Sequence, residues 1–212
     1  MIFDDLPKVI SVFPLSNAIF FPKTILPLNI FEKRYIQLVS DCMKNQRLFG
    51  MIQPTSKKKL VPEVYKVGCL GKIINFNEIS DGRYIINLSG IIRFKIQKEL
   101  STDKLYRKFE VDYSEFKNDL HLEKIEKEKY NVKNLLQKIN SYFKKKQYSI
   151  QLSELEELNF DQLISTICMI APFSVEEKQK LIETIKIEQK IQILEEIINI
   201  NLFDNMESRT IQ

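Results

Sequence analysis

The sequence predicts an α+β protein in which a curved, mostly antiparallel sheet or pseudo-barrel is followed by an all-helical bundle. Residues 67–98 contain two runs in which apolar and polar side chains alternate, a pattern typical of strands with one buried face. Beyond about residue 118 apolar residues recur at helical intervals, with no glycine and with Pro172 as the only proline. We therefore expect a β-rich part over residues 1–117 and a helical part over 118–212, frayed after about residue 203.

The amino-terminal segment combines a short strand with a path that prolines interrupt. Residues 9–12 favour a strand. Phe13-Pro14, Phe21-Pro22 and Leu26-Pro27 then force an extended, irregular path that carries large apolar side chains. Such a path is stable only where it is pressed against a core.

A helix is expected after this path, followed by a strand. Asn29 stands at an N-cap position with Glu32 three residues later, which is the spacing of a capping box. Apolar side chains then recur at helical spacing, namely Phe31, Tyr35, Leu38, Val39 and Cys42. Residues 48–53 favour a buried strand that Pro54 ends, and residues 55–60 favour a solvated loop.

The clearest local pattern is a β-hairpin over residues 67–98. Asp81-Gly82, between the two alternating runs, favours the type I′ turn that matches the twist of paired strands. In the second strand the polar face is expected to include Arg93. Three glycines inside the strands indicate bulges or tight bends, as in a curved sheet or small barrel: Gly68, Gly71 and Gly90. Residues 109–113 favour another strand.

The carboxy-terminal part is expected to contain three main helices. An apolar stripe from Leu122 to Phe143 predicts the first, and a very apolar run over residues 160–171, ended by Pro172, predicts the second. Ser174 and Glu177 form another capping-box spacing. We expect one long final helix to follow it.

Composition favours a cytoplasmic protein without a membrane segment. No run approaches the roughly 18 apolar residues that span a bilayer, and the acidic start differs from the basic start of a secretory signal. Cys42, Cys69 and Cys168 are expected to be reduced, buried thiols. The net charge of +4 comes mostly from lysine, which we interpret as a solvated surface because arginine supplies bidentate phosphate recognition.

No pattern in the chain predicts catalysis, a metal site or a cofactor site. The sequence has no HExxH, GxSxG, Cys/His cluster or GxxxxGK[ST] phosphate loop. His121 is the only histidine and cannot assemble a histidine-rich metal site. Glutamates such as Glu154, Glu156 and Glu157 lie among lysines and favour a solvated face. We therefore expect no catalytic, cofactor-binding or metal-binding residues and no enzyme activity.

An ordered set of short motifs carries a resemblance over about residues 9–194. The motifs are Phe13-Pro14-Leu15, Phe21-Pro22, Leu26-Pro27-Leu28, Ile30-Phe31-Glu32, Arg34-Tyr35, Leu48-Phe49-Gly50, Gln53-Pro54, Val67-Gly68-Cys69, Gly71, Asp81-Gly82-Arg83-Tyr84, Leu88, Gly90, Arg93-Phe94, Glu99-Leu100, Phe116, Asp119, Pro172-Phe173 and Glu177-Lys178-Gln179. In this the chain resembles the amino-terminal substrate-recognition domain of Lon proteases, in its stand-alone form. Many relatives have Gly at position 23 and Pro at position 33, where this chain has Lys23 and Lys33.

The resemblance implies a PUA-like curved sheet followed by a helical bundle, and recognition without proteolysis. A complete Lon protease also needs an ATPase motor and a Ser-Lys peptidase domain, for which these 212 residues leave no room. Unfolded or extended polypeptides are the implied binding partners, with an ATP-dependent protease as a further partner.

Candidate binding residues combine aromatic area with charge: Phe31, Glu32, Arg34, Tyr35, Arg83 and Arg93. Phe31 and Tyr35 are four residues apart and are expected to share a partly buried helix face, with Arg34 turned about 100° away from Tyr35. An alternative role for Glu32 is to cap the helix and to pair with Arg34 or Arg83.

Three functions remain open at this point. The first is a non-catalytic module that binds exposed or unfolded polypeptide segments, partly by pairing with a sheet edge. The second is an RNA-binding PUA-like module, although the strands place few aromatic side chains where bases could stack. The third is an enzyme of unknown type, which a pocket of converging Glu or Lys side chains would support.

Overall fold

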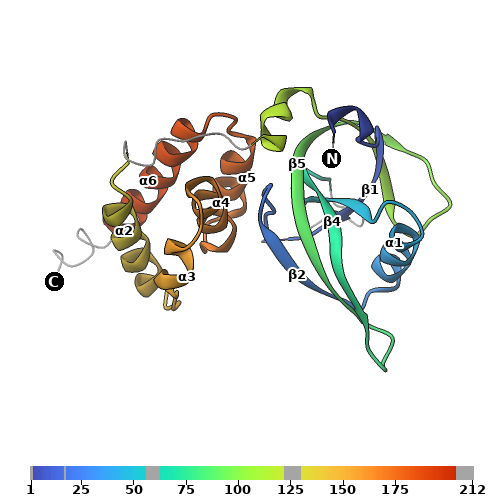
Figure 1. Ribbon diagram of the computed structural model, residues 1–212, viewed down its shortest axis with the longest axis horizontal. Coiled ribbons are helices and arrows are strands. Elements are labelled where there is room, and N and C mark those ends of the chain that lie inside the picture. The colour runs from blue at the N-terminus through green and yellow to red at the C-terminus, as the bar shows by residue number, and fades with distance from the viewer. Residues whose placement is uncertain (1, 17, 56–62, 122–129, 204–212) are drawn as a thin grey trace. The chain divides into compact units, whose positions relative to one another are not determined.

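The computed structural model describes residues 2–16, 18–55, 63–121 and 130–203, and it confirms the predicted α+β class. Backbone contacts divide the chain into two compact units, Met1–Leu122 and Glu123–Gln212. The described strands all belong to the first unit, and the described part of the second unit contains helices only (Figure 1).

The first unit alternates strands with short helical segments. Its strands are β1 (Val9–Pro14), β2 (Ile25–Ile30), β3 (Leu48–Ile52), β4 (Val67–Glu78), β5 (Tyr84–Leu100) and β6 (Arg107–Asp112). Its helical segments are the 3₁₀-helix η1 (Phe3–Asp5), the α-helix α1 (Lys33–Met43) and the 3₁₀-helix η2 (Ser114–Leu120). The predicted strands over residues 9–12, 48–53 and 109–113 are thus confirmed within one or two residues, while the loop predicted over 55–60 lies mostly outside the described residues.

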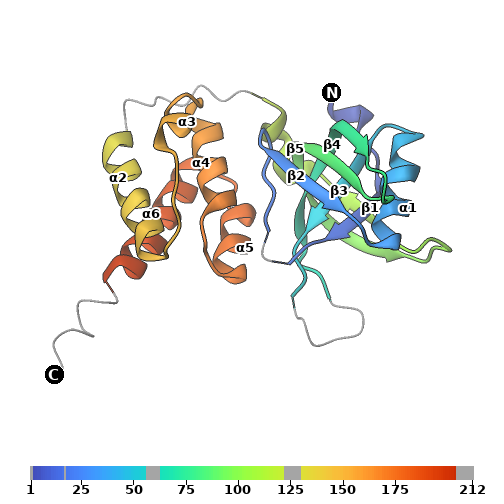
Figure 2. The ribbon, with the colours of Figure 1, turned by 90° about the horizontal axis from the view of Figure 1, so that it is seen from below.

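The strands of the first unit close into a small barrel (Figures 1 and 2). Their order is β2-β5-β4-β3-β1-β6, and β6 also pairs with β5, so that five of the strands form a ring. The β1–β3 pair is parallel and the other described pairs are antiparallel, which confirms the mostly antiparallel sheet. Strand β2 stands outside the ring and pairs with the first part of β5.

Apolar side chains from every part of the first unit fill its core. Phe20 and Phe21, from the proline-interrupted path, are 2% and 0% exposed, so this path is pressed against the core as predicted. Burying an aromatic or aliphatic side chain of this size contributes about 1.5–3 kcal/mol relative to leaving it in water. The barrel side chains with no exposed surface include Val12, Phe49, Leu70, Leu88, Ile92 and Phe94.

Strand β2 corrects two predictions. Its residues were expected to follow an irregular path, but Leu28 and Ile30 bury their side chains while the strand pairs with β5. Asn29 lies in this strand opposite Ile85, so the predicted capping box is wrong. Helix α1 begins at Lys33, and Glu32 occupies its N-cap without a side-chain hydrogen bond to the helix. Strand pairing and burial therefore outweigh the local capping pattern.

A bulge introduces β2 immediately after Pro22. The N–H of Lys23 donates to the Gly90 carbonyl at 2.9 Å, and the Gly90 N–H donates to the Thr24 carbonyl at 2.9 Å. Lys23 has a φ of +63°, so the three residues form the pattern of a G1 bulge, whose first position usually holds glycine. A tight turn thus forms here with lysine at position 23.

The β4–β5 hairpin is confirmed, but its turn is not the predicted type I′. The Gly82 N–H donates to the Ile79 carbonyl at 2.9 Å, and the Ile79 N–H donates to the Arg83 carbonyl at 3.0 Å. Gly82 has a φ of +81°, whereas Asp81 is not among the residues with positive φ. These bonds describe a three-residue loop with glycine in the left-handed position, a turn that serves a hairpin equally well.

The described part of the second unit is a set of five helices. They are α2 (Val132–Lys145), α3 (Leu152–Glu156), α4 (Phe160–Ile170), α5 (Val175–Glu183) and α6 (Ile187–Phe203). Ser174 and Glu177 form the predicted capping box at the start of α5, and Pro172 follows the end of α4 as predicted. The start predicted for the first helix, residues 122–129, lies outside the described residues.

The long final helix of the sequence analysis is in fact two helices. Thr184 takes an extended conformation, with φ −72° and ψ 119°, and separates α5 from α6. Its hydroxyl donates to the Lys180 carbonyl at 2.7 Å, so the side chain supplies a hydrogen bond to a carbonyl in the last turn of α5. The apolar stripe persists across the break because Ile182 and Ile187 are both buried, and this continuity concealed the break from a periodicity argument.

Candidate functional site

The start of α1 separates two residues that were expected to share a face. Phe31 precedes the helix and is 63% exposed, whereas Tyr35 is 5% exposed. The Tyr35 ring stacks on Phe13 with ring centres 3.8 Å apart, and its hydroxyl donates to the Pro14 carbonyl at 3.3 Å. Burial raises the pKa of Tyr35. Tyr35 therefore anchors α1 to the barrel, and Phe31 alone of the two presents a ring to solvent.

Glu32 and Arg34 form an exposed pair beside this anchor. Nε of Arg34 donates to Oε2 of Glu32 at 2.9 Å, and the guanidinium lies 4.5 Å from the centre of the Tyr35 ring. The long side chain of Arg34 thus turns back over Tyr35 despite the 100° between their positions on the helix. A pair this exposed contributes about 0–1 kcal/mol to stability, so its main effect is to hold the guanidinium in place.

Arg83 lies at the same end of the sheet as Phe31. Ile30 pairs with Tyr84, so Phe31, which follows β2, and Arg83, which precedes β5, both lie next to the last pair at this end of the two strands. Nε of Arg83 donates to Oδ2 of Asp81 at 2.7 Å, and this bond holds the pKa of the Asp81 carboxyl below its usual value. The structure therefore brings Phe31, Glu32, Arg34 and Arg83 to one edge of the first unit.

Arg93 is not on an exposed face as the alternation in β5 had suggested. It is 3% exposed, and Nη2 donates to Oδ1 of Asp119 at 2.7 Å. The segment η2 covers this part of β5, which periodicity within one strand cannot reveal. Arg93 braces the sheet and stands apart from the edge that carries Phe31.

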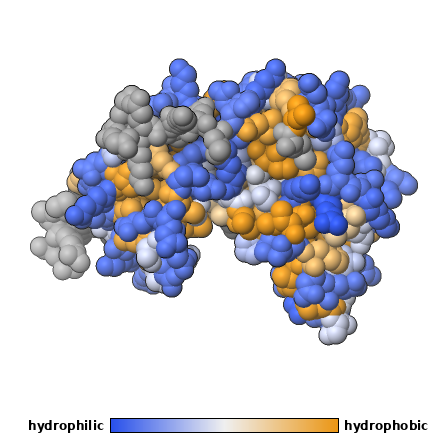
Figure 3. All heavy atoms as spheres, in the orientation of Figure 1, coloured by the Kyte–Doolittle hydropathy of each residue, from blue (hydrophilic) through white to orange (hydrophobic). Residues whose placement is uncertain are grey.

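The sequence analysis predicted Phe31 as a binding residue but missed three further exposed apolar side chains beside it on the outer face of β2 and β5. We name the four side chains together the outer strip: Ile25, Pro27, Phe31 and Ile85. Ile25 is 54% exposed and Ile85 is 40% exposed. Apolar atoms are visible over the strands of this unit in Figure 3. The signal in the sequence was an isoleucine at position 85, on the face of β5 where the alternation calls for polar residues.

The open edge of β2 is only partly available for pairing with another strand. The Thr24 carbonyl accepts from Gly90, so alternation directs the backbone groups of Leu26, Leu28 and Ile30 toward β5. Ile25, Pro27 and Asn29 then direct theirs outward, and proline has no N–H to donate. An added strand could form only a short ladder here, so side-chain contacts must supply part of any binding energy.

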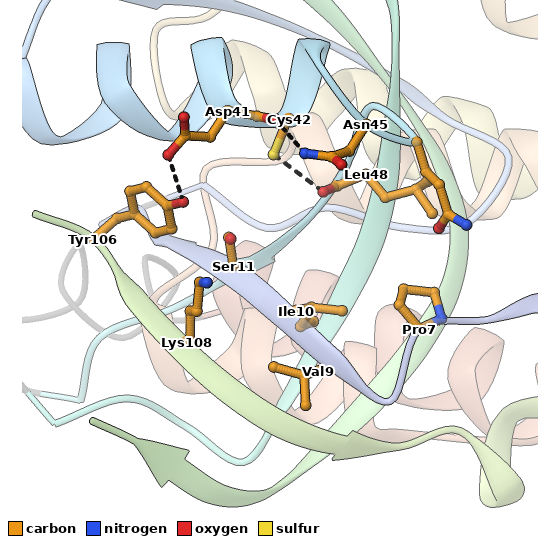
Figure 4. A pocket seen from close by; sticks show the side chains of 11 residues that line it. Pro7, Val9, Ile10, Ser11, Asp41, Cys42, Asn45, Leu48, Tyr106 and Lys108 are labelled. Carbon is orange, nitrogen blue, oxygen red and sulfur yellow. Dashed lines mark hydrogen bonds between the residues drawn. The ribbon is translucent and has the colours of Figure 1, made fainter. Parts of the chain in front are cut away.

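A pocket of about 350 Å³ lies elsewhere on the first unit, between α1, β1 and β6 (Figure 4). One part of its wall is apolar and includes Pro7, Val9, Ile10 and Leu48. The remainder carries polar or charged groups from Ser11, Asp41, Cys42, Asn45, Gln46, Tyr106 and Lys108. The prediction of binding residues included none of these, because they are brought together from three segments that are far apart in sequence.

Asp41 is the acidic group of this pocket and is already well supplied with partners. The Tyr106 hydroxyl donates to Oδ2 of Asp41 at 2.9 Å, and Nζ of Lys104 lies 3.3 Å from the same oxygen. The bond from Tyr106 is the main reason that the pKa of the Asp41 carboxyl is lowered. Burial raises the pKa of the Cys42 thiol to about 12, so this thiol is protonated and donates to the Leu48 carbonyl at 3.2 Å.

Neither a metal cluster nor a membrane span is found in the residues that the structure describes. No three His, Cys, Asp or Glu side chains among them gather closely enough to hold an ion. None of the described helices combines the length and apolar character needed to cross a bilayer. Cys42, Cys69 and Cys168 are buried and form no disulfide bond, as expected of buried thiols.

Comparisons with known proteins agree on one family. The model of the ATP-dependent protease La (LON) substrate-binding domain matches residues 9–199. The Lon protease of Anaeromyxobacter dehalogenans (strain 2CP-C) is 23% identical over 201 residues, and Lon protease 2 of Myxococcus xanthus is 24% identical over 201 residues. Each match covers 92% of this chain but 24% of the relative, so the chain spans about a quarter of the length of these curated relatives.

A solved structure shows the same fold over nearly the whole chain. The crystal structure of a Lon N-terminal domain protein from Xanthomonas campestris matches with a TM-score of 0.61 and 21% identity. The match covers 88% of this chain and 96% of that one. The chain belongs to the family of the ATP-dependent protease La (LON) substrate-binding domain.

Proposed function

We propose that this chain is a non-catalytic recognition module that binds exposed or unfolded polypeptide segments through the outer strip and the charged residues beside it. Phe31 and Ile85 offer apolar area, and Glu32, Arg34 and Arg83 offer charge along the same edge. The observation that carries the proposal is the family match over residues 9–199. The description of that family is of a substrate-binding domain, and the substrates of a protease are polypeptides.

Two properties of the outer strip support binding of unfolded segments in particular. Its side chains are apolar and exposed, as a surface must be if it is to bury the apolar residues of a partner. The adjoining edge of β2 offers Ile25 and Asn29 as backbone donors and acceptors, and such pairing does not depend on the partner's sequence. A short ladder with apolar contacts gives weak, sequence-tolerant binding, which suits a module that must accept many partners.

RNA binding is the weaker alternative because the arginines are already occupied. Phosphate recognition favours arginine side chains whose guanidinium N–H groups are free to donate to phosphate oxygens. Four of the six arginines in the sequence instead pair with carboxylates of the same chain: Arg34 with Glu32, Arg83 with Asp81, Arg93 with Asp119 and Arg107 with Glu99. An RNA would have to compete with each of these carboxylates.

The proposal includes a protease partner and a cytoplasmic setting. This chain matches about a quarter of the length of Lon proteases, whose names attribute proteolysis to the whole proteins. A recognition module of this family would act by delivering polypeptides to such an ATP-dependent protease. Its buried and unbonded cysteines suit a reducing compartment.

Fluorescence anisotropy with labelled ligands tests the proposed function. One ligand is an unfolded, reduced and alkylated polypeptide, and the other is a single-stranded RNA at low salt. We expect binding of the polypeptide and no binding of the RNA. Binding of the RNA alone, with an affinity that falls steeply as salt is raised, would replace this proposal with the alternative.

A further inference from the structure

We propose that the pocket between α1, β1 and β6 binds the carboxy-terminal carboxylate of a polypeptide, with Lys108 as the group that pairs with it. The inference rests on the proposed function and names a second element of recognition, a chain end, on a face of the first unit separate from the outer strip. The pocket holds about 350 Å³, within the range of small-ligand sites.

The charges of the pocket leave a cation without a partner. Asp41 accepts from Tyr106 at 2.9 Å and has the Lys104 ammonium at 3.3 Å and the Lys44 ammonium at 3.8 Å. Within the described residues the Lys108 ammonium makes no hydrogen bond or ion pair, even with Glu110 two residues along the same strand. The negative charge of Asp41 is therefore already compensated by Lys104 and Lys44. The charge in the pocket that an incoming ligand could compensate is the positive charge of Lys108, which an anion would pair with.

Strand register fixes where this ammonium can reach. Lys108 of β6 stands directly opposite Ser11 of β1 in an antiparallel pair, so their side chains leave the sheet on the same face. Figure 4 shows both side chains directed from their strands toward α1, beside Tyr106. The anion would thus meet a lysine on a rigid strand, beside Ser11, whose hydroxyl bonds to Tyr106. A lysine on a strand is more closely positioned than one on a loop.

The rest of the wall suits the last residue of a chain more than a free inorganic ion. Pro7, Ile10 and Leu48 form an apolar surface that can cover a side chain. Asn45, which lies at the other side in Figure 4, and Gln46 also line the pocket. Nδ2 of Asn45 donates to the Asp41 carbonyl at 2.8 Å, so its amide oxygen can accept from a peptide N–H. A carboxylate, an apolar side chain and a peptide group occur together at the end of a polypeptide.

A matched pair of peptides tests the inference. Both carry a dye at the amino end and end in leucine, one as the free acid and the other as the amide. We expect the acid to bind the intact chain at least tenfold more tightly, which corresponds to about 1.4 kcal/mol. Lys108→Met should remove this preference and Lys108→Arg should preserve it. Lys98→Met is the control, since Lys98 is exposed and does not line the pocket.

The outcomes separate this inference from the proposed function. Equal binding of acid and amide would overturn the carboxylate pocket while leaving polypeptide binding intact. An acid preference that survives in Lys108→Met would also overturn it, because the carboxylate would then be read elsewhere. If 4-methylpentanoate, which has the carboxylate and the side chain of leucine but no peptide group, competes as well as the full peptide, the ligand is a small carboxylic acid, and the chain-end assignment fails. Absence of binding to every polypeptide would remove the proposed function as well.

Discussion

Arg93 of β5 and Asp119 of η2 form a nearly buried ion pair joined at two points. Nε of Arg93 donates to Oδ2 of Asp119 at 2.9 Å, and Nη2 donates to Oδ1 at 2.7 Å. The backbone N–H of Arg93 donates to Oδ2 at 2.9 Å as well, and the guanidinium lies 4.7 Å from the centre of the Phe116 ring. The pair fastens η2 to the barrel and fixes the end of the first unit.

Removing the acid of this pair should destabilise the protein strongly. Asp119→Ala leaves the Arg93 charge buried without its partner, which costs about 3–5 kcal/mol in the free energy of unfolding. Asp119→Asn keeps an acceptor and should cost less. Urea unfolding followed by circular dichroism measures both. Asp81→Ala removes an exposed partner of Arg83 and should change nothing measurable; an equal loss in both alanine variants would contradict this account.

Replacing Lys23, at the first position of the G1 bulge, with glycine should stabilise the folded protein. The left-handed conformation of Lys23 costs about 1–2 kcal/mol for a residue with a Cβ, whereas glycine adopts it freely. Glycine also loses about 0.5–1 kcal/mol of chain entropy on folding, so Lys23→Gly should stabilise by about 0.5 kcal/mol. Thermal unfolding is the measurement. Lys23→Ala is the control, because it removes the bond from Nζ to the His121 carbonyl but keeps the strain. A gain in the alanine variant would assign the effect to the side chain instead.

Two glycines should respond differently to alanine. A Cβ on Gly90 would lie 2.0 Å from the Phe21 carbonyl oxygen, so the variant must displace the backbone at the bulge, and we expect a loss above about 3 kcal/mol. A Cβ on Gly82 would meet no atom within 4 Å, and only its φ of +81° opposes alanine, at about 1 kcal/mol. Unfolding in urea compares them, and the reverse order would show that the bulge tolerates displacement.

The bond between Tyr106 and Asp41 should make part of the stability dependent on pH. The folded state lowers the pKa of Asp41, so this stabilisation is complete above the unfolded value near pH 4 and is lost as pH falls through the lowered value. Tyr106→Phe should cost about 1 kcal/mol at pH 7, because a quarter of the Asp41 side chain is exposed. The gap between variant and wild type should narrow below about pH 4. A gap that stays constant down to pH 2 would mean that Asp41 does not accept this bond.

The side chains of the outer strip should contribute to polypeptide binding but not to the stability of the fold. Phe31→Ser with Ile85→Ser removes two exposed apolar side chains, and we expect at least tenfold weaker binding of an unfolded polypeptide with an unchanged unfolding curve. Anisotropy titrations and urea unfolding give the two readouts. Leu105→Ser, at a site that is 62% exposed on another part of the unit, should alter neither. If the Leu105 variant weakens binding as much, the binding depends on general hydrophobicity and the strip has no special role.

Local patterns predicted the elements of this fold better than the contacts between them. The β4–β5 alternation and the Ser174–Glu177 spacing each contain their own physical cause, a buried face and a capped helix end, and both are confirmed. Asn29 showed the same kind of pattern, but strand pairing with β5 prevailed, because a neighbouring strand 56 residues away in sequence is invisible to a local argument.

The candidate site followed the same rule. Phe31, Glu32 and Arg34 lie within four residues of one another, so their proximity was predictable, whereas the position of Arg83 at the same end of the sheet follows from strand register. Arg93 could not be placed correctly, since its burial depends on η2. The pocket could not be predicted from the sequence, because its side chains come from α1, β1 and β6 and no one of these segments shows a recognisable binding pattern.

Calorimetric titration with one polypeptide in two states shows whether this chain binds unfolded segments in preference to folded ones. The polypeptide is compared in its native form and in a permanently unfolded form made by reducing and alkylating its disulfides, with no nucleotide present. We expect measurable heat and a dissociation constant for the unfolded form, and none for the native form. Absence of binding by the unfolded form up to about 1 mM, which corresponds to about 4 kcal/mol, would contradict the proposed function.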